Sequence, residues 1–276
     1  MKLYHSSGSP NSRRVRILIA EKGLDIELAP VDLGAKEQFS DAYRAMNPRA
    51  VVPTLVLDDG TAIGEVPAIM RYLDEAYPKV PLLGATPKEK ALITMWERRA
   101  ELEGFAPVME GVRNAAAGLK GRAISGPHGY EQIPALIERS KQRMANFYTD
   151  FEARLKDVEF VAGDRFSAAD ITTLVTVDFA TQAFAMPIPD DSVALKRWYG
   201  AVSRLVRVQL PSGHGSCDGR IRFAYPPGNN KDDDHVCSDR QNRSRYRRIA
   251  RHGPRQCACA RRGRCPGSHP LRPGRQ

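Results

Sequence analysis

Met-Asn-Pro-Arg-Ala-Val-Val-Pro-Thr-Leu, at residues 46–55, decides how the first part of the chain is interpreted. Asn47-Pro48 ends a helix predicted over Lys36–Met46, because a residue before proline disfavours the helical backbone. A strand is expected next, at Thr54–Leu57, and the Val52-Pro53 bond leads into it. A cis bond here would turn the N–H and C=O of Val52 outward, able to pair with an extended peptide. With a trans bond, Pro53 would simply begin an edge strand.

The segments on both sides of this stretch predict a small α/β region over residues 1–76. Pro30 places its strand at a sheet edge, where a missing N–H is tolerated. Asn11 or Ser12 can cap the first helix, which ends at Lys22-Gly23. Asp58-Asp59-Gly60 predicts a hairpin turn. The expected strands are Lys2–His5, Ile26–Val31, Thr54–Leu57 and Thr61–Ile63, and the third helix is expected over about Pro67–Ala76.

A change of pattern after residue 76 predicts a second, all-helical domain. Residues 77–88 are rich in proline and mark the expected domain boundary, and apolar residues then recur at helical spacing to about residue 204. Ser167-Ala-Ala-Asp170 is a capping box that starts another helix. We interpret Ser167 and Asp170 as a structural cap. The predicted organisation is an α/β domain at 1–78, a helical domain at 88–204 and a disordered basic tail at 205–276.

Net charge and cysteine content both change between residues 204 and 205. The chain of 276 residues has a net charge of +10, but residues 205–276 carry about +11 and residues 1–204 about −1. All five cysteines lie in the tail. Apolar residues make up 42% of the chain, without a run long enough to span a membrane. The first residues lack the apolar core of a secretory signal. We therefore expect a globular cytoplasmic protein.

Two helix starts could carry chemistry. Ser9-Pro10-Asn11-Ser12 places a hydroxyl beside free backbone N–H groups at the positive end of a helix, which suits a thiolate or another anion. The alternative is that these residues only cap the helix. In Gly64-Glu65-Val66-Pro67, N-terminal amides can hold a carboxylate and Glu65 an ammonium group. There the alternative is an acidic residue that merely complements the helix dipole.

The order and spacing of these stretches resemble the cytosolic glutathione transferase family, of the bacterial, serine-type kind. The resemblance covers about residues 1–204. It rests on Ser-Pro-Asn-Ser-Arg-Arg-Val-Arg-Ile (9–17), residues 46–55, Ala-Ile-Met-Arg-Tyr-Leu-Asp-Glu-Ala-Tyr-Pro (68–78) and Gly-Asp-Arg-Phe-Ser-Ala-Ala-Asp-Ile (163–171). It implies a thioredoxin-like N-terminal domain that binds glutathione and an all-α C-terminal domain that lines the acceptor site.

The resemblance also implies catalytic residues. Ser9 matches the family's hydroxyl residue and would donate a hydrogen bond to the glutathione sulfur. Asn11 could assist, as the corresponding asparagine does in bacterial relatives that reduce disulfides. The nucleophile belongs to glutathione, so the absence of cysteine from residues 1–204 is no obstacle.

The same resemblance implies residues that bind glutathione. The backbone of Val52, with Pro53 cis, would pair with the cysteinyl unit, and Glu65 would hold the γ-glutamyl end. Val66 stands where the family has serine, so one hydroxyl contact is lost and binding is expected to be about tenfold weaker or more. Gln38 is a candidate contact for the glycine end.

The expected function is therefore transfer of glutathione to small hydrophobic electrophiles in detoxification, or glutathione-dependent reduction of a peroxide or disulfide. Glutathione is the co-substrate, no metal is expected, and the family implies a homodimer. The alternative is a non-catalytic glutathione-fold protein of stress responses. Phe105, Met109 and Val112 share one helix face that could line the acceptor pocket, but such stripes are more often core.

The tail departs from the family at about Arg204. Residues 205–210 can be encoded by CTC GTC CGA GTG CAA CTG, and dropping the first two bases of that set gives Arg-Pro-Ser-Ala-Thr, which resembles a typical family ending. We hypothesise that the tail is translated out of frame. Its arginines could otherwise bind nucleic acid, a partner we do not expect, and Cys257, Cys259 and Cys265 with His252 or His269 could bind zinc, although their spacing lacks the paired knuckle.

Overall fold

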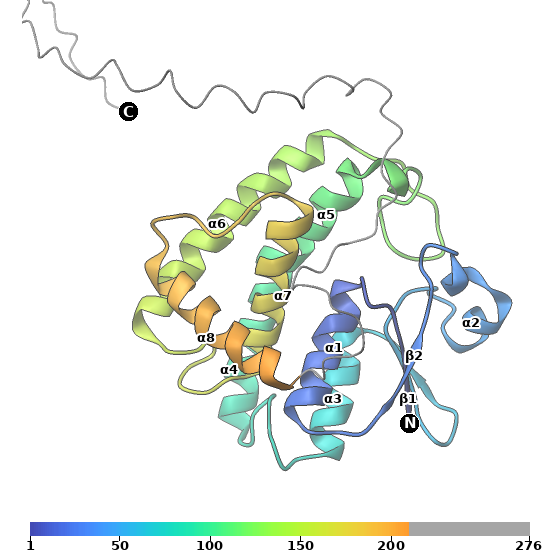
Figure 1. Ribbon diagram of the computed structural model, residues 1–276, viewed down its shortest axis with the longest axis horizontal. Helices are drawn as coiled ribbons and strands as arrows, with labels where there is room; N and C mark the ends of the chain where they lie inside the picture. Colours follow the sequence, from blue (N-terminus) through green and yellow to red (C-terminus); the bar gives the residue numbers. More distant parts are fainter. Residues whose placement is uncertain (210–276) are drawn as a thin grey trace, which may run out of the picture. The chain divides into compact units, whose positions relative to one another are not determined.

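A four-stranded sheet is the central layer of the N-terminal part of the chain (Figure 1). The computed structural model describes residues 1–209, with side chains through residue 206. β1 pairs in parallel with β2 and antiparallel with β3, and β4 pairs antiparallel with β3. Pro30 therefore ends an edge strand, as the sequence predicts. The strands are β1 (Lys2–His5), β2 (Glu27–Pro30), β3 (Thr54–Val56) and β4 (Ala62–Ile63).

Helices α1 and α3 share a core with this sheet. Leu3 and Leu55 of the strands belong to the same fully buried cluster as Leu18 of α1 and Ile69 and Leu73 of α3. The apolar side chains of the strands and of both helices thus meet in one core. The helical elements of this part are α1 (Pro10–Glu21), the 3-10 turn η1 (Glu37–Phe39), α2 (Asp41–Met46) and α3 (Val66–Ala76).

The single helix predicted over Lys36–Met46 is wrong. Ser40 has an extended backbone, with φ −62° and ψ 152°, and separates η1 from α2. Its Oγ accepts the N–H of Tyr43 at 3.2 Å, so Ser40 caps α2. A serine side chain competes with helical hydrogen bonding in this way and favours a helix start over a helix interior.

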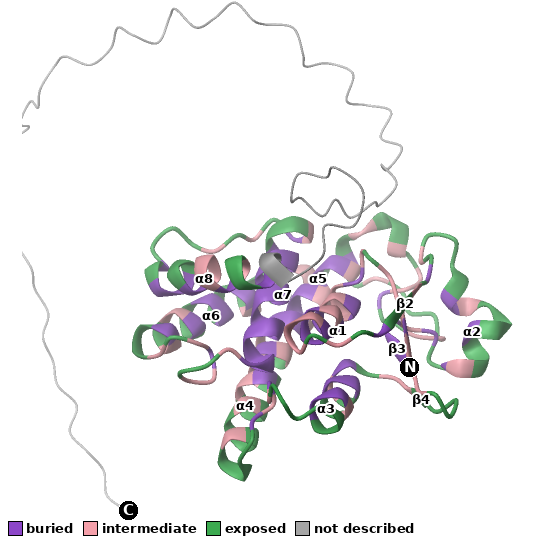
Figure 2. Cartoon of the chain, turned by 60° about the horizontal axis from the view of Figure 1, so that its bottom comes forward, coloured by how far each residue is buried: buried purple, intermediate pink, exposed green. Residues whose placement is uncertain are grey.

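The remaining described residues are helical, and α7 lies at their centre (Figure 1). Every residue of α7 from Ala168 to Ala180 is buried, as its colour in Figure 2 shows. Thr173 and Thr176 satisfy their buried hydroxyls by donating to carbonyls one turn earlier, each at 2.8 Å. The elements are α4 (Pro87–Arg99), the π-helical η2 (Ala100–Phe105), α5 (Ala106–Ala115), the 3-10 turn η3 (Ala117–Leu119), α6 (Ala135–Asp157), α7 (Ala168–Ala183) and α8 (Val193–Gln209).

The capping box predicted at the start of α7 is present. Ser167 donates both its N–H and its hydroxyl to one oxygen of Asp170, each at 3.0 Å. The other oxygen accepts the N–H of Val161 at 2.9 Å and the indole N–H of Trp198 at 2.8 Å. Asp170 is fully buried, and this burial raises the pKa of its carboxyl to about 6. The cap therefore joins α7 to α8 and to the chain that precedes it.

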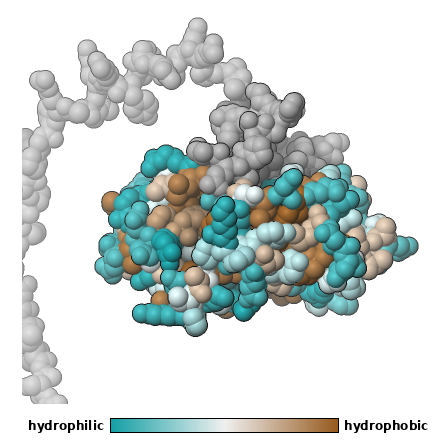
Figure 3. All heavy atoms as spheres, turned by 90° about the horizontal axis from the view of Figure 1, so that it is seen from below, coloured by the Kyte–Doolittle hydropathy of each residue, from teal (hydrophilic) through white to brown (hydrophobic). Residues whose placement is uncertain are grey.

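The described part of the chain ends with α8, which reaches Gln209. The helix therefore extends past residue 204, where the sequence predicted the end of the helical domain. The predictions for the rest of 205–276, including disorder, an altered reading frame and the zinc-spaced cysteines, lie outside the described residues. Among the described helices, none is long and apolar enough to cross a membrane. On the face shown in Figure 3, apolar side chains occur in separate patches between hydrophilic ones.

Candidate functional site

A cavity of about 320 Å³ lies between the N-terminal ends of α1 and α3 and the loop before β3. Residues from the first part of the chain line one side, and Phe105, Met109 and Val112 of the helical part line the other. The structure brings all the predicted catalytic and glutathione-binding residues together here: Ser9, Asn11, Gln38, Val52, Pro53, Glu65 and Val66.

Ser9 is the N-cap of α1, and the predicted caps Asn11 and Ser12 are wrong. Pro10 occupies the first helical turn, where its fixed φ and missing N–H fit, so the helix starts earlier than expected. The Ser9 Oγ accepts the N–H of Ser12 at 3.2 Å. Among the described residues no group accepts the Ser9 hydroxyl proton. The hydroxyl therefore caps the helix and keeps its proton available to a ligand in the cavity.

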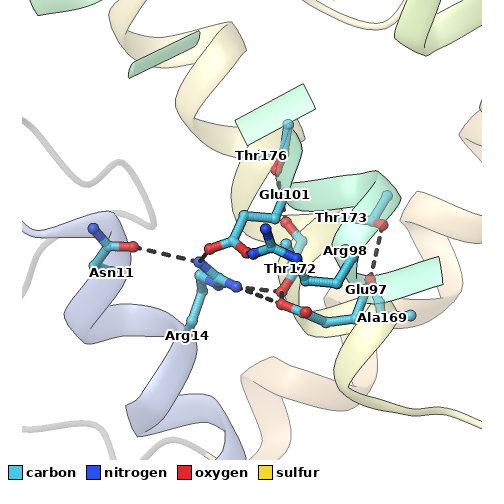
Figure 4. A network of polar contacts seen from close by, with 9 residues as sticks. All are labelled: Asn11, Arg14, Glu97, Arg98, Glu101, Ala169, Thr172, Thr173 and Thr176. Carbon is cyan, nitrogen blue, oxygen red and sulfur yellow. Dashed lines mark hydrogen bonds and ion pairs between the residues drawn. The ribbon is translucent and has the colours of Figure 1, made fainter. Parts of the chain in front are cut away.

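The side chain of Asn11 accepts a hydrogen bond from a buried arginine, Arg14 (Figure 4). Its Oδ1 accepts Nη1 of Arg14 at 3.4 Å, which leaves the amide N–H donors of Asn11 for the cavity that it lines. Arg14 is fully buried on α1. Its orientation is therefore set by contacts with helices that follow much later in the chain.

Those contacts join α1 to α4, η2 and α7. Arg14 Nη2 lies 2.6 Å from Glu97, its Nη1 lies 3.2 Å from Glu101, and its Nε donates to Thr172 at 3.1 Å. Thr172 also donates to Glu97 at 3.1 Å. Burial raises the pKa of Glu97, and the Arg14 guanidinium acts against that rise. The network fixes the position of Asn11 beside the cavity.

Sequence reasoning missed this network. A signal was present, because Glu97 and Glu101 are one turn apart and Arg14 lies one turn before Leu18 on the buried side of α1. Pairing an arginine with those carboxylates, however, requires knowing that α1 and α4 approach each other. Sequence patterns within one helix do not contain that information.

The loop before β3 presents backbone groups to the cavity. The Val52-Pro53 bond is cis, as the resemblance implies. Tyr43 donates its hydroxyl to the carbonyl of Val51 at 2.7 Å, and Asn47 donates its amide to the same oxygen at 3.1 Å. Among the described residues no group bonds to the backbone N–H or C=O of Val52. Both remain available to pair with an extended ligand.

The start of α3 faces the same cavity. Glu65 has a left-handed backbone, with φ 62°, an unusual conformation for a residue other than glycine. Such conformations cluster at ligand sites. The Glu65 side chain is exposed and makes no capping bond. Val66 buries its side chain in the core, while the first N–H groups of α3 lack helical partners.

Gln38 lies at the other end of the cavity. Its side chain is only 3% exposed, and its Oε1 is buried without a hydrogen-bond partner among the described residues. An unpaired buried acceptor carries a desolvation cost that a ligand donor would remove.

Comparison with known proteins identifies the family of this chain. Residues 3–82 match the model of the glutathione S-transferase N-terminal domain, and residues 134–201 match that of the C-terminal domain. Glutathione S-transferase 2 of Saccharomyces cerevisiae is 35% identical over 201 residues, which cover 72% of this chain and 84% of the relative. The chain belongs to the glutathione transferase family. Like its relatives, it is a glutathione transferase enzyme, with the transferase fold that the sequence predicts.

Solved structures agree with this assignment. A glutathione S-transferase domain-containing protein of Marinobacter aquaeolei is 37% identical to the transferase, with a TM-score of 0.68, and the match covers 74% of this chain and 97% of that one. Gtt2 of Saccharomyces cerevisiae is 33% identical, with a TM-score of 0.68, and covers 76% of this chain and 100% of its own.

A second cavity of the transferase adjoins the first and measures about 730 Å³. Phe105 and Met109 line both cavities, and Asn11 lies at their junction. The walls of the second cavity include exposed apolar side chains, among them Leu102, Ile124 and Ile133. Phe105 and Met109, which the sequence could place either in the core or in an acceptor pocket, therefore line both cavities.

Proposed function

We propose that the Ser9 hydroxyl donates a hydrogen bond to the sulfur of glutathione and stabilises its thiolate. The observation that carries the proposal is the Ser9 Oγ in the cavity wall, which already accepts the Ser12 N–H and retains its own proton. The partial positive charge at the N-terminus of α1 acts in the same direction.

The energies are sufficient for this role. Lowering a thiol pKa by two units from about 8.5 requires roughly 2.7 kcal/mol of preference for the thiolate. One hydrogen bond to a charged group supplies about 1.5–3 kcal/mol, and the helix dipole adds about 0.3–1 kcal/mol. Asn11, oriented by Arg14, offers a second donor to the sulfur.

The remaining parts of glutathione fit the other walls of the cavity. The backbone of Val52 pairs with the cysteinyl unit, and the carboxylate of Glu65 holds the γ-glutamyl ammonium group. The N–H of Val66 binds the neighbouring carboxylate without the hydroxyl that family members add. Gln38 lies toward the glycyl end, where its free Oε1 accepts an N–H.

The acceptor is a small hydrophobic electrophile bound in the second cavity, beside Phe105 and Met109. Attack by the thiolate forms the thioether and expels the leaving group or, with a peroxide or disulfide, begins its reduction. Such chemistry serves detoxification in the cytoplasm. We also propose a homodimer, which the exposed Leu92 and Met95 of α4, at 40% and 46% exposure, would help to form.

Turnover of chlorodinitrobenzene with glutathione by the full chain tests this function. We expect Ser9→Ala to lower kcat/KM by about 100-fold, in the range found when one donor to an oxyanion is removed. Ser7→Ala is the matched control, because Ser7 is exposed and outside the cavity wall. Equal activity of wild type and Ser9→Ala would refute the role of Ser9. Glutathione binding without turnover by wild type would favour the non-catalytic alternative.

A further inference from the structure

Three serines around the start of α1 are joined in a closed ring of hydrogen bonds. Ser9 donates its N–H to the carbonyl of Ser6 at 3.1 Å, and Ser6 donates its own N–H to the Oγ of Ser12 at 3.2 Å. Ser12 in turn donates its N–H to the Ser9 Oγ at 3.2 Å. The position of the Ser9 hydroxyl therefore depends on the shape of the connection over residues 6–9, here called the β1–α1 loop.

Arg16, one turn further along α1 than Ser12, binds this loop from outside the ring. Its Nη1 donates to the carbonyl of Ser6 at 3.5 Å, and its Nη2 donates to that of Ser7 at 3.3 Å. A guanidinium group is planar and presents its donors in a fixed fork. Binding two successive carbonyls in this way fixes the orientation of both peptide groups.

His5, the last residue of β1, binds the same guanidinium. Its Nδ1 lies 2.9 Å from Nη1 of Arg16. Because arginine can only donate, Nδ1 is the acceptor, and the ring carries its proton on Nε2. A doubly protonated imidazole has no acceptor, so this contact requires neutral His5. Burial, followed by the charge of Arg16, lowers the pKa of His5 and favours that neutral form.

The partners of Arg16 differ in charge from those of its neighbour Arg13. Arg13 forms an ion pair with Asp178 of α7, 2.6 Å from Nη1 to Oδ2. Arg16 has only neutral acceptors among the described residues, and burial together with the charge of Arg13 lowers its pKa. Its contacts thus lie on His5 and on the loop that leads to Ser9.

We propose that Arg16, bound to neutral His5, is a positioning residue that holds the β1–α1 loop and, through it, the Ser9 hydroxyl at the sulfur of glutathione. This inference rests on the proposed function and extends it. The connection is short, because the Ser6 carbonyl that accepts from Arg16 also accepts the N–H of Ser9. A misplacement of about 1 Å in a reacting group can lower a rate about 100-fold.

The pKa of the glutathione thiol bound to the full chain, measured from the ultraviolet absorbance of the thiolate, tests this role. We expect Arg16→Gln to raise that pKa by about 1 and to lower kcat/KM about tenfold at a pH below it. KM for glutathione should change much less, since Val52 and Glu65 lie outside the loop. Arg16→Lys keeps the charge without the fork and should raise the thiol pKa by a smaller amount.

Two variants of His5 test the neutral acceptor. His5→Asn places an amide oxygen near the position of Nδ1 and cannot gain a proton, so it should keep the thiol pKa of wild type. His5→Leu removes the acceptor and should raise the thiol pKa as Arg16→Gln does. An equal thiol pKa in these two variants would overturn the inference.

Arg13→Gln is the matched control. It removes the same charge from the same helix and breaks the ion pair with Asp178, so it also costs stability in urea unfolding. The Arg13 side chain pairs with α7, and its loss should leave the thiol pKa unchanged. An equal rise in Arg13→Gln and Arg16→Gln would overturn the inference, because it would indicate a general effect of charge or stability.

A double variant shows whether Arg16 acts through Ser9. In the Ser9→Ala background, Arg16→Gln should have no further effect on the thiol pKa, and a full additional rise would overturn the inference. If Ser9→Ala raises the thiol pKa and Arg16→Gln leaves it at the wild-type value, the inference is overturned and the proposed function stands. An unchanged thiol pKa in Ser9→Ala would overturn both.

Discussion

Two serines cap helices in this transferase, and their surroundings give them different roles. Ser9 opens α1 in the wall of a cavity, is 8% exposed, and has no acidic residue in the helical turn that follows. Ser167 opens α7 inside the core, is 1% exposed, and gives its hydroxyl proton to Asp170. Both residues satisfy the same local rule for a helix start.

The difference lies in the acceptor for the hydroxyl proton. Asp170 takes that proton's hydrogen bond at the start of α7, so every polar atom of that cap is engaged by the protein. At the start of α1 the corresponding acceptor is missing among the described residues, and Ser9 is one of the residues that line the cavity. A helix cap can therefore offer a hydroxyl donor to a ligand when the protein leaves its proton without a partner.

The largest expected effect is a difference in the free energy of unfolding between variants of the two caps. Asp170→Asn replaces an acceptor with an amide that faces the donors of Ser167, so we expect a loss of at least about 3 kcal/mol in the free energy of unfolding. Ser9→Ala should cost only about 1 kcal/mol, the usual value of one cap. Urea unfolding of both variants measures this, and equal losses would contradict the division into core cap and cavity cap.

A smaller effect is expected from placing a hydroxyl at the first residue of α3, which is among the residues that line the same cavity. Val66→Ser restores a donor for the γ-glutamyl carboxylate and should raise glutathione affinity about tenfold, although burying serine in place of valine lowers stability. Calorimetric titration with S-methylglutathione measures the gain. The control is Val193→Ser, on an exposed residue of α8. An unchanged affinity in Val66→Ser would indicate that the backbone N–H alone binds this carboxylate.

The smallest expected effect is a pH dependence of the stability that Asp170, in the cap of α7, contributes. The pKa of Asp170 rises from 3.8 to about 6 because the carboxyl is buried. The folded chain therefore holds this proton more tightly than the unfolded chain, and the contribution of Asp170 to stability falls as pH rises through that interval. Between pH 5 and pH 7 the loss is about 1 kcal/mol. Urea unfolding at both pH values should show this slope in wild type and lack it in Asp170→Asn.

Much of the fold could be predicted from local patterns. The edge position of Pro30 and the capping box at Ser167 follow from spacing and residue type, and the structure contains both of them. The break at Ser40 was missed because a serine inside an apolar pattern is compatible with either a continuous helix or a new start. Packing decides between the two.

The site was predicted in part, for a similar reason. Ser9 and Val52 lie in short motifs whose residue types and order are distinctive. Arg14 depends instead on contacts between segments far apart in the chain, because its partners Glu97 and Thr172 lie on other helices. Residues that a site draws from a distant element are therefore the ones that sequence patterns miss.

The buried Arg14 has a consequence for the order of events during synthesis. Its partners Glu97, Glu101 and Thr172 leave the ribosome long after Arg14 itself. A guanidinium group without its carboxylates remains hydrated, since burying an unpaired charge is strongly unfavourable. The strands and helices of the first part can form as they emerge, but the Arg14 site is completed only when residue 172 has been released. The Asn11 side of the first cavity is therefore completed only after residue 172 has been made, although Asn11 is among the first residues of the chain.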